Sequence, residues 1–183
     1  VPRLWTLFQL NIINKIGENK LNFLLKVPII SSIVKRKIQK GLGLEHCRLL
    51  GSGSAPIPPT LLKWYHSIGM NICEAWGMTE NCAYSIINFP FNPNKIGSVG
   101  RAIEGCQVRR TEQGELMVKS PGLMKGYYLQ EEATAAAFDE DGFFYTGDLC
   151  EIDSDGYIDI TGRVKDNFKT SKLPLDNKVI PLT

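Results

Sequence analysis

The sequence has few of the residues that build metal sites and disulfide frameworks. It contains two histidines, and its five cysteines are an odd number with no C-x-x-C spacing. We therefore expect reduced thiols in a cytoplasmic protein, with neither a zinc site nor a disulfide frame. The sequence also lacks a run of about 20 apolar residues, the length that a membrane-spanning helix needs. Its most apolar stretch, 21–34, is interrupted by Lys26 and Pro28.

What is present is the composition of a globular protein with a basic beginning. Apolar residues make up 43% of the 183 residues and charged residues 22%, which argues against a disordered chain. The net charge is +2, but residues 1–40 hold eight basic residues and one acidic residue. A segment with a charge of +7 favours contact with an anionic surface, and a membrane more readily than nucleic acid. The alternative is an ordinary solvated helix face.

Two helices are predicted in this basic segment. Trp5, Phe8, Ile12 and Ile16 recur at helical spacing, and Gly17 ends the pattern. A second helix is expected at 28–40, because proline suits a first helical position. It would carry an apolar face beside four basic residues. That face either packs on the core or lies on a membrane surface.

The next segment has the pattern of a βαβ unit. A strand at 47–50 leads into the glycine-rich loop 51–56, a helix follows from 58 to 69, and a strand is predicted at 70–73. Parallel pairing of the two strands is expected. From residue 83 the pattern changes to short strands joined by glycine turns, with a hairpin formed by 107–110 and 115–119 and a short helix at 131–138.

The predicted fold class is therefore α/β, with N-terminal helices, a βαβ unit and a small twisted β-rich subdomain. We divide the chain into a helical segment 1–44, an α/β part 45–82, a β-rich part 83–164, and a hinge with an irregular tail at 165–183.

Residues 74–80, Glu-Ala-Trp-Gly-Met-Thr-Glu, carry the strongest chemical signal. An indole beside a glycine offers a stacking face for a nucleobase. A hydroxyl beside a carboxylate can hold a phosphate oxygen and Mg²⁺ together. In isolation, the better interpretation of the same residues would be a tryptophan in the core and a Thr-Glu helix cap. The acidic stretch 153–156 is interpreted as a reverse turn, because an EF-hand would need a glutamate where Gly162 stands.

Three phrases together resemble the acyl-adenylate-forming enzymes: acyl-CoA synthetases, luciferases and the adenylation domains of peptide synthetases. They are Trp-Gly-Met-Thr-Glu at 76–80, Tyr-Thr-Gly-Asp at 145–148 and Gly-Arg-Val-Lys-Asp at 162–166. Residues 97–101 and 120–128 also resemble this family, in structural roles. The opening Val-Pro-Arg-Leu-Trp and the helical insert resemble its long-chain fatty acyl-CoA synthetase branch. The resemblance covers residues 1–172 and breaks at Leu173.

The resemblance implies a fragment of the large domain, and it implies site residues. Ser54, Ala55 and Pro56 would line the adenine pocket, although glycine is commoner at Ser54. Trp76 would cover the adenine beside Gly77, in place of the family's usual tyrosine. The remaining expected roles are Thr79 on a phosphate oxygen, Glu80 on Mg²⁺ as the metal ligand, Asp148 and Arg163 on the ribose, and Lys165 as the hinge to a small C-terminal domain.

The implied reaction uses a fatty acid, ATP, Mg²⁺ and coenzyme A. We expect the family's phosphate loop upstream of these residues and its catalytic lysine downstream, so we predict that this polypeptide alone does not form acyl-AMP at a useful rate. Robust fatty-acid-dependent ATP–pyrophosphate exchange by the purified chain would contradict this. Two alternatives remain: luciferase-like or amino-acid-activating chemistry, and a truncated, non-catalytic remnant that binds nucleotide or membrane. Reading the open reading frame outward separates a synthetase from a remnant.

Overall fold

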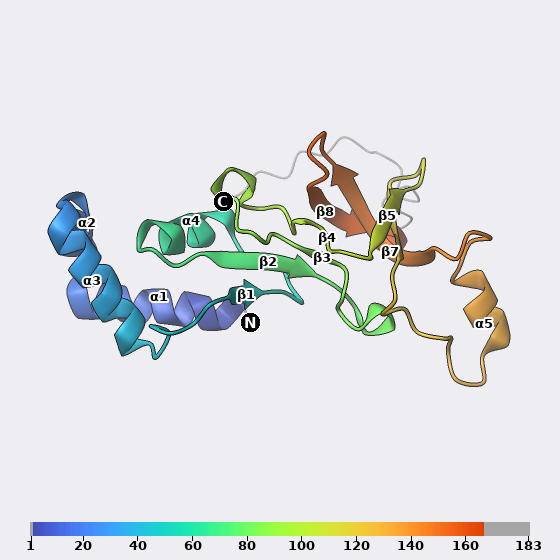
Figure 1. Ribbon diagram of the computed structural model, residues 1–183, viewed down its shortest axis with the longest axis horizontal. Coiled ribbons are helices and arrows are strands. Elements are labelled where there is room, and N and C mark those ends of the chain that lie inside the picture. Colours follow the sequence, from blue (N-terminus) through green and yellow to red (C-terminus); the bar gives the residue numbers. More distant parts are fainter. Residues whose placement is uncertain (1, 167–183) are drawn as a thin grey trace, which may run out of the picture.

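The computed structural model describes residues 2–166, and the tail predicted at 173–183 lies outside them. The described chain is elongated, with helices at one end, a sheet in the middle and a second sheet beyond it (Figure 1). No described helix is long and apolar enough to span a membrane.

Three helices form the N-terminal end. They are α1 (Pro2–Ile16), α2 (Glu18–Lys26) and α3 (Pro28–Gly41). Gly17 separates the first two with a φ of 84°, a backbone conformation that favours glycine, and Pro28 opens the third. The helices predicted before Gly17 and at 28–40 are therefore confirmed. Helix α2 was not predicted from the sequence, because its short apolar pattern merges with that of α3.

The first sheet has the strand order β1-β2-β3-β4. Strands β1 (Leu50–Ser52) and β2 (Ile72–Trp76) pair in parallel, and α4 (Pro59–Ser67) lies between them in the sequence. The expected parallel βαβ pairing is thus confirmed, but β1 begins three residues later than predicted. Strand β2 continues to Trp76, three residues beyond its predicted end, so the first half of the 74–80 motif is strand. Two short antiparallel strands, β3 (Ile86–Ile87) and β4 (Arg101–Ala102), complete the sheet.

The second sheet is an antiparallel meander in the order β5-β6-β7-β8. Its strands are β5 (Gln107–Arg110), β6 (Glu115–Lys119), β7 (Phe144–Ile152) and β8 (Ile158–Arg163), and α5 (Glu131–Ala136) projects beyond β6. The turn before β8 is the one predicted at 153–156. Both of its aspartates, Asp153 and Asp155, are paired with Lys95, at 2.6 Å and 2.7 Å.

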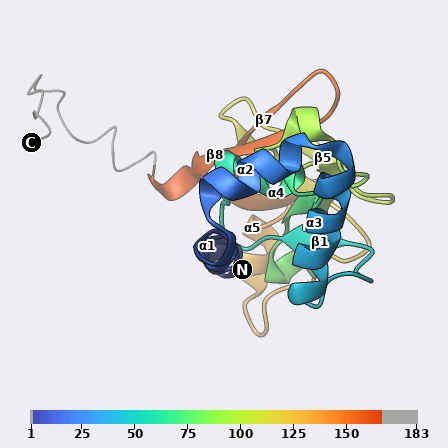
Figure 2. The same ribbon diagram turned by 90° about the vertical axis from the view of Figure 1, so that its left-hand side faces the viewer.

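The described residues form two hydrophobic cores. One core is formed by the N-terminal helices, α4 and β2, and it centres on Tyr65, which is fully buried. The other includes Phe144 and Ile158 of the second sheet together with Ile86 on β3, so both sheets contribute to it. Figure 2 shows the helices of the first core in front of the sheets. Gly100 is one point of contact between the two sheets, because its carbonyl oxygen accepts from the N–H of Ile158 on β8 over 2.8 Å while it packs against the backbone of Ile87 on β3.

Candidate functional site

The candidate site lies at the carboxyl ends of the two parallel strands. Loop 53–56 leaves β1 at the edge where residues 77–80 leave β2, since parallel strands end at the same edge of a sheet. The loop packs closely against the end of β2, because a Cβ on Gly53 would lie 3.0 Å from the carbonyl oxygen of Ala75. Ser54 has a φ of 67°, the conformation that explains why glycine suits this position.

Trp76, Asp148 and Arg163 meet at the junction of the two sheets. The indole Nε1 of Trp76 donates a hydrogen bond to Oδ2 of Asp148 over 2.9 Å. The guanidinium of Arg163 donates to the other oxygen, Oδ1. These residues come from three strands, and Asp148 and Arg163 are direct cross-strand partners on β7 and β8. The chain therefore brings together three groups that lie up to 87 positions apart in the sequence.

Asp148 is buried and its backbone is fixed by its neighbours. The residue is only 7% exposed. The hydroxyl of Thr146 accepts from the Asp148 N–H over 3.1 Å and donates to the carbonyl of Leu116 over 2.7 Å. Glu115 accepts from the N–H of Gly147 over 2.8 Å. The Thr-Gly-Asp phrase thus places one carboxylate rigidly, because its hydroxyl and its glycine are both tied to β6.

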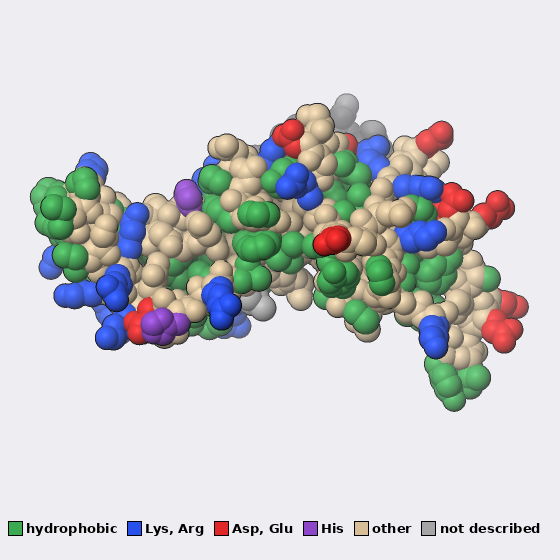
Figure 3. Space-filling model, viewed as in Figure 1, with side chains coloured by type: hydrophobic (Ala, Val, Ile, Leu, Met, Phe, Trp, Pro, Cys, Tyr) green, Lys and Arg blue, Asp and Glu red, His purple; other side chains and the backbone are tan. Residues whose placement is uncertain are grey.

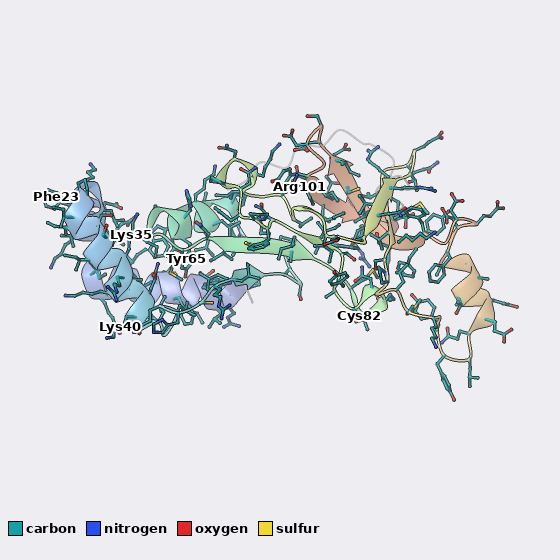
Figure 4. All side chains as sticks on the ribbon, in the orientation of Figure 1. Phe23, Lys35, Lys40, Tyr65, Cys82 and Arg101 are labelled. Atoms are coloured by element: carbon teal, nitrogen blue, oxygen red, sulfur yellow. The ribbon has the colours of Figure 1, made fainter. Side chains whose placement is uncertain are left out.

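Thr79 and Glu80 lie on a short 3₁₀ turn, η1 (Thr79–Asn81), that follows β2. The side chain of Asn81 closes the turn by accepting from the N–H of Met78 over 2.9 Å. Gly77 is required here, because a Cβ would lie 2.5 Å from Cα of Ala83. Figure 4 shows this turn at the labelled Cys82. Thr79 is exposed and Glu80 is half-buried, so both are accessible to a ligand.

The carboxylate of Glu80 is not part of the cluster around Asp148. Its recorded side-chain partner is Tyr127, whose hydroxyl donates to Oε1 over 3.2 Å. The expected site residues therefore form two groups: Trp76, Asp148 and Arg163 in direct contact, and Thr79 with Glu80 on the turn that begins three residues after Trp76.

A further carboxylate, Glu74, lies within β2. It is 7% exposed, and its Oε2 accepts from the N–H of Gly97 over 3.0 Å. Burial raises its pKa from 4.5 to about 7, the bond from Gly97 opposes this, and the charge of Asp159 adds to it. Glu74 thus belongs to the framework that holds the segment before Trp76.

The turn with Thr79 and Glu80 fits a magnesium ion that is also bound by substrate phosphates, rather than an ion enclosed by protein ligands alone. Among the described residues no group of three or more His, Cys, Asp or Glu side chains could hold a metal. Mg²⁺ commonly takes one or two carboxylates and completes its shell with water and substrate phosphates. One accessible carboxylate with a neighbouring hydroxyl, as Glu80 and Thr79 present, suits that mode of binding.

Several contacts of the site were not predicted from the sequence. The indole N–H bond to Asp148 and the Tyr127 bond to Glu80 join residues 72 and 47 positions apart. The cross-strand pairing of Asp148 with Arg163 was predictable from the sequence, because the turn at 153–156 sets the register of the hairpin formed by β7 and β8. Lys165, the expected hinge residue, follows β8 and is exposed, and its hinge role stays a prediction.

Comparison with known proteins identifies the family. The sequence model of the AMP-binding enzyme family matches residues 1–128, more than half of the chain. The chain belongs to this family, and the resemblance inferred from its three phrases is confirmed. Among its relatives are fatty-acid–CoA ligases.

Three similar proteins indicate the range of that family. The chain is 39% identical over 134 residues to the putative fatty-acid–CoA ligase fadD11 of Mycobacterium tuberculosis, an alignment covering 73% of this chain and 23% of that protein. It is 32% identical over 165 residues to 2-succinylbenzoate–CoA ligase of Bacillus pumilus, covering 85% of this chain and 33% of that protein. The structure of O-succinylbenzoate coenzyme A synthetase from Bacillus subtilis in complex with AMP matches with a TM-score of 0.61 and 30% identity, covering 72% of this chain and 30% of that one. The chain thus spans about a quarter to a third of the length of these proteins.

Proposed function

We propose that this chain supplies the nucleotide-binding part of an ATP-dependent long-chain fatty acid–CoA ligase. The observation that supports this most strongly is the meeting of Trp76, Asp148 and Arg163 on one carboxylate. A carboxylate has about four lone-pair positions, and these two donors use two of them. The remaining two suit the paired hydroxyls of a ribose.

The other residues are assigned roles around the same nucleotide. The indole face of Trp76 covers the adenine, and the loop of Ser54, Ala55 and Pro56, with Gly77, forms the walls of its pocket. Arg163 adds a permanently charged donor beside the ribose. Thr79 binds a phosphate oxygen. Glu80 would hold Mg²⁺, and that ion, when bound, neutralises charge on the phosphates.

The reaction proposed for the complete enzyme has two steps. A carboxylate oxygen of the fatty acid attacks the α-phosphorus of ATP, and the bond to pyrophosphate breaks. The thiol sulfur of coenzyme A then attacks the acyl carbon and loses its proton to solvent, and AMP leaves with the electron pair of the acyl–oxygen bond. The described residues position the nucleotide and stabilise its charge, and these effects can supply much of the rate enhancement.

The role of Glu80 is tested by Glu80→Gln in the complete enzyme. We expect adenylation, measured as ATP–pyrophosphate exchange, to fall by about 100-fold, because the variant loses the charge that faces the metal. Transfer of a preformed acyl-adenylate to coenzyme A should change much less. Glu112→Gln in the exposed hairpin turn is the matched control. Equal losses in both half-reactions would contradict the metal role.

Two other adenylate-forming activities are alternatives to this proposal: luciferase-like oxidation and amino-acid activation. A panel of carboxylic acids offered to the complete enzyme separates them. The relative acting on 2-succinylbenzoate supports the inclusion of aromatic acids in that panel. A truncated remnant that only binds nucleotide would activate none of the acids.

A peripheral contact with the cytoplasmic face of a membrane is also proposed, through residues 28–40 with the adjoining α2. Ile29 and Ile33 on α3 are 78% and 54% exposed, and Phe23 on α2 is 67% exposed. Apolar and basic side chains gather together at this end of the molecule (Figure 3), and Phe23 points away from the body of the chain (Figure 4). Exposed apolar residues beside lysine and arginine are typical of helices that lie on anionic membranes.

A further inference from the structure

Tyr127 belongs to a segment that the sequence analysis assigned only structural roles. Its side chain is 37% exposed, so its hydroxyl is not needed to fill the core. That hydroxyl nevertheless donates to Oε1 of Glu80, 47 residues earlier in the chain, over 3.2 Å. A phenol hydroxyl can donate one hydrogen bond, and this one is directed at the carboxylate.

The backbone around Tyr127 is tied to the same turn as its side chain. The N–H of Met124 donates to the carbonyl oxygen of Glu80 over 2.7 Å. Gly122 packs so closely on the turn that a Cβ there would lie 2.9 Å from the carbonyl oxygen of Asn81. Residues 122–127 are thus bound to η1 at three points, and Tyr127 is the one that reaches the carboxylate.

Tyr127 is itself held from the other side by α5. Its N–H donates to the hydroxyl of Thr134 over 2.9 Å, and that hydroxyl donates to the carbonyl of Gln130 over 2.8 Å. Gly126 makes this approach feasible, because a Cβ there would lie 2.7 Å from the methyl group of Thr134. The phenol therefore extends from a fixed backbone, and its hydroxyl can restrain a flexible partner.

We infer that Tyr127 is a positioning residue for Glu80, holding Oε1 so that Oε2 is presented to the metal of the bound nucleotide. In residues 2–166, Oε2 of Glu80 has no recorded hydrogen-bond or ion-pair partner. A glutamate side chain loses considerable rotational freedom when it binds a ligand. Because the Tyr127 hydroxyl already restrains one carboxylate oxygen, the Glu80 side chain has less rotational freedom left to lose when the metal binds. The inference rests on the metal role proposed for Glu80.

The test is a double-mutant cycle on nucleotide binding to the complete enzyme, measured by isothermal titration calorimetry. Tyr127→Phe keeps the ring and removes only the hydroxyl. We expect it to weaken binding of ATP with Mg²⁺ by about fivefold, the effect of losing one hydrogen bond to a charged group. Binding of AMP, and of ATP in the presence of EDTA, should stay within about twofold of the parent enzyme.

The controls separate this inference from the proposed function. Tyr128→Phe alters an adjacent tyrosine that is 87% exposed and should change neither affinity. In a Glu80→Gln background, Tyr127→Phe should weaken binding of ATP with Mg²⁺ no further, because the carboxylate that Tyr127 positions for the metal is already gone. A Tyr127→Phe enzyme with unchanged affinity for ATP with Mg²⁺, or with equal losses in EDTA, would overturn the inference. An unchanged affinity in Glu80→Gln alone would instead overturn the metal role itself.

Discussion

At the scale of single residues, Glu74 is a buried carboxylate that can lose its charge by binding a proton. Its raised pKa means that the folded chain binds a proton at Glu74 more tightly than the unfolded chain does. Its contribution to stability is therefore favourable below the unfolded pKa and falls as pH rises. The fall occurs between the unfolded value of 4.5 and the folded value of about 7.

Replacing Glu74 with glutamine should remove this pH dependence. The amide oxygen can still accept from the N–H of Gly97, and no charge has to be buried. We expect Glu74→Gln to match the parent chain at pH 4.5 and to be more stable at pH 8 by an amount on the order of 2–3 kcal/mol. Urea unfolding at the two pH values, followed by circular dichroism, measures the difference. Glu112→Gln, on an exposed turn, is the control, and a gain that is the same at both pH values would contradict the prediction.

At the scale of elements, Gly100 is a point at which the two sheets contact each other closely. Gly100 has a φ of 102°, and a Cβ there would lie 1.9 Å from the carbonyl carbon of Ile87. Its backbone is also bonded to Ile158 on β8. Any side chain at this position must push β3 and β8 apart.

Gly100→Ala should therefore cost far more than the backbone conformation alone explains. Gly156 provides a matched control, because its φ of 79° is also positive while nothing lies within 4 Å of its added Cβ. We expect Gly156→Ala to lower the free energy of unfolding by about 1 kcal/mol and Gly100→Ala by about 3 kcal/mol or more. Chemical denaturation of both variants tests this, and similar costs would show that the sheets are not held together at Gly100.

Local patterns predicted the elements better than they predicted the contacts between them. Gly17, Pro28 and the turn at 111–114 mark boundaries within a few residues, so the flanking helices and the hairpin were predictable. The start of strand β1 was predicted three residues too early, because the apolar residues before it give no signal of where strand pairing starts. The contact of Trp76 with Asp148 crosses from one sheet to another, and no periodicity in the sequence encodes such a distance. The phrases pointed to the family and to a hypothesis for the chemistry of the site, whereas the geometry of the site depends on how the sheets pack.

At the scale of the whole molecule, one end is both apolar and basic. Phe23, Ile29 and Ile33 lie exposed on the helix pair α2–α3, and a hollow of about 630 Å³ beside them is lined in part by Lys35, Arg36 and Lys40. This arrangement would place apolar side chains in the acyl boundary of a membrane and the basic groups near lipid phosphates.

The complete protein should therefore sediment with vesicles that contain phosphatidylserine and much less with neutral phosphatidylcholine vesicles. The double variant Ile29→Asn, Ile33→Asn should reduce the bound fraction by about tenfold in partition coefficient, because it removes the apolar anchor. Leu129→Asn, at the opposite end and equally exposed, should have no effect. Failure of the parent protein to bind either vesicle would indicate that other parts of the enzyme cover these helices.

The bond between Trp76 and Asp148 has a consequence for the unfolding of the whole chain. Trp76 ends a strand of one sheet and donates to a carboxylate of the other, so a nucleotide bound at this point would contact both sheets at once. Calorimetry should then record a higher unfolding temperature in the presence of saturating AMP, because the nucleotide binds only while both sheets are folded.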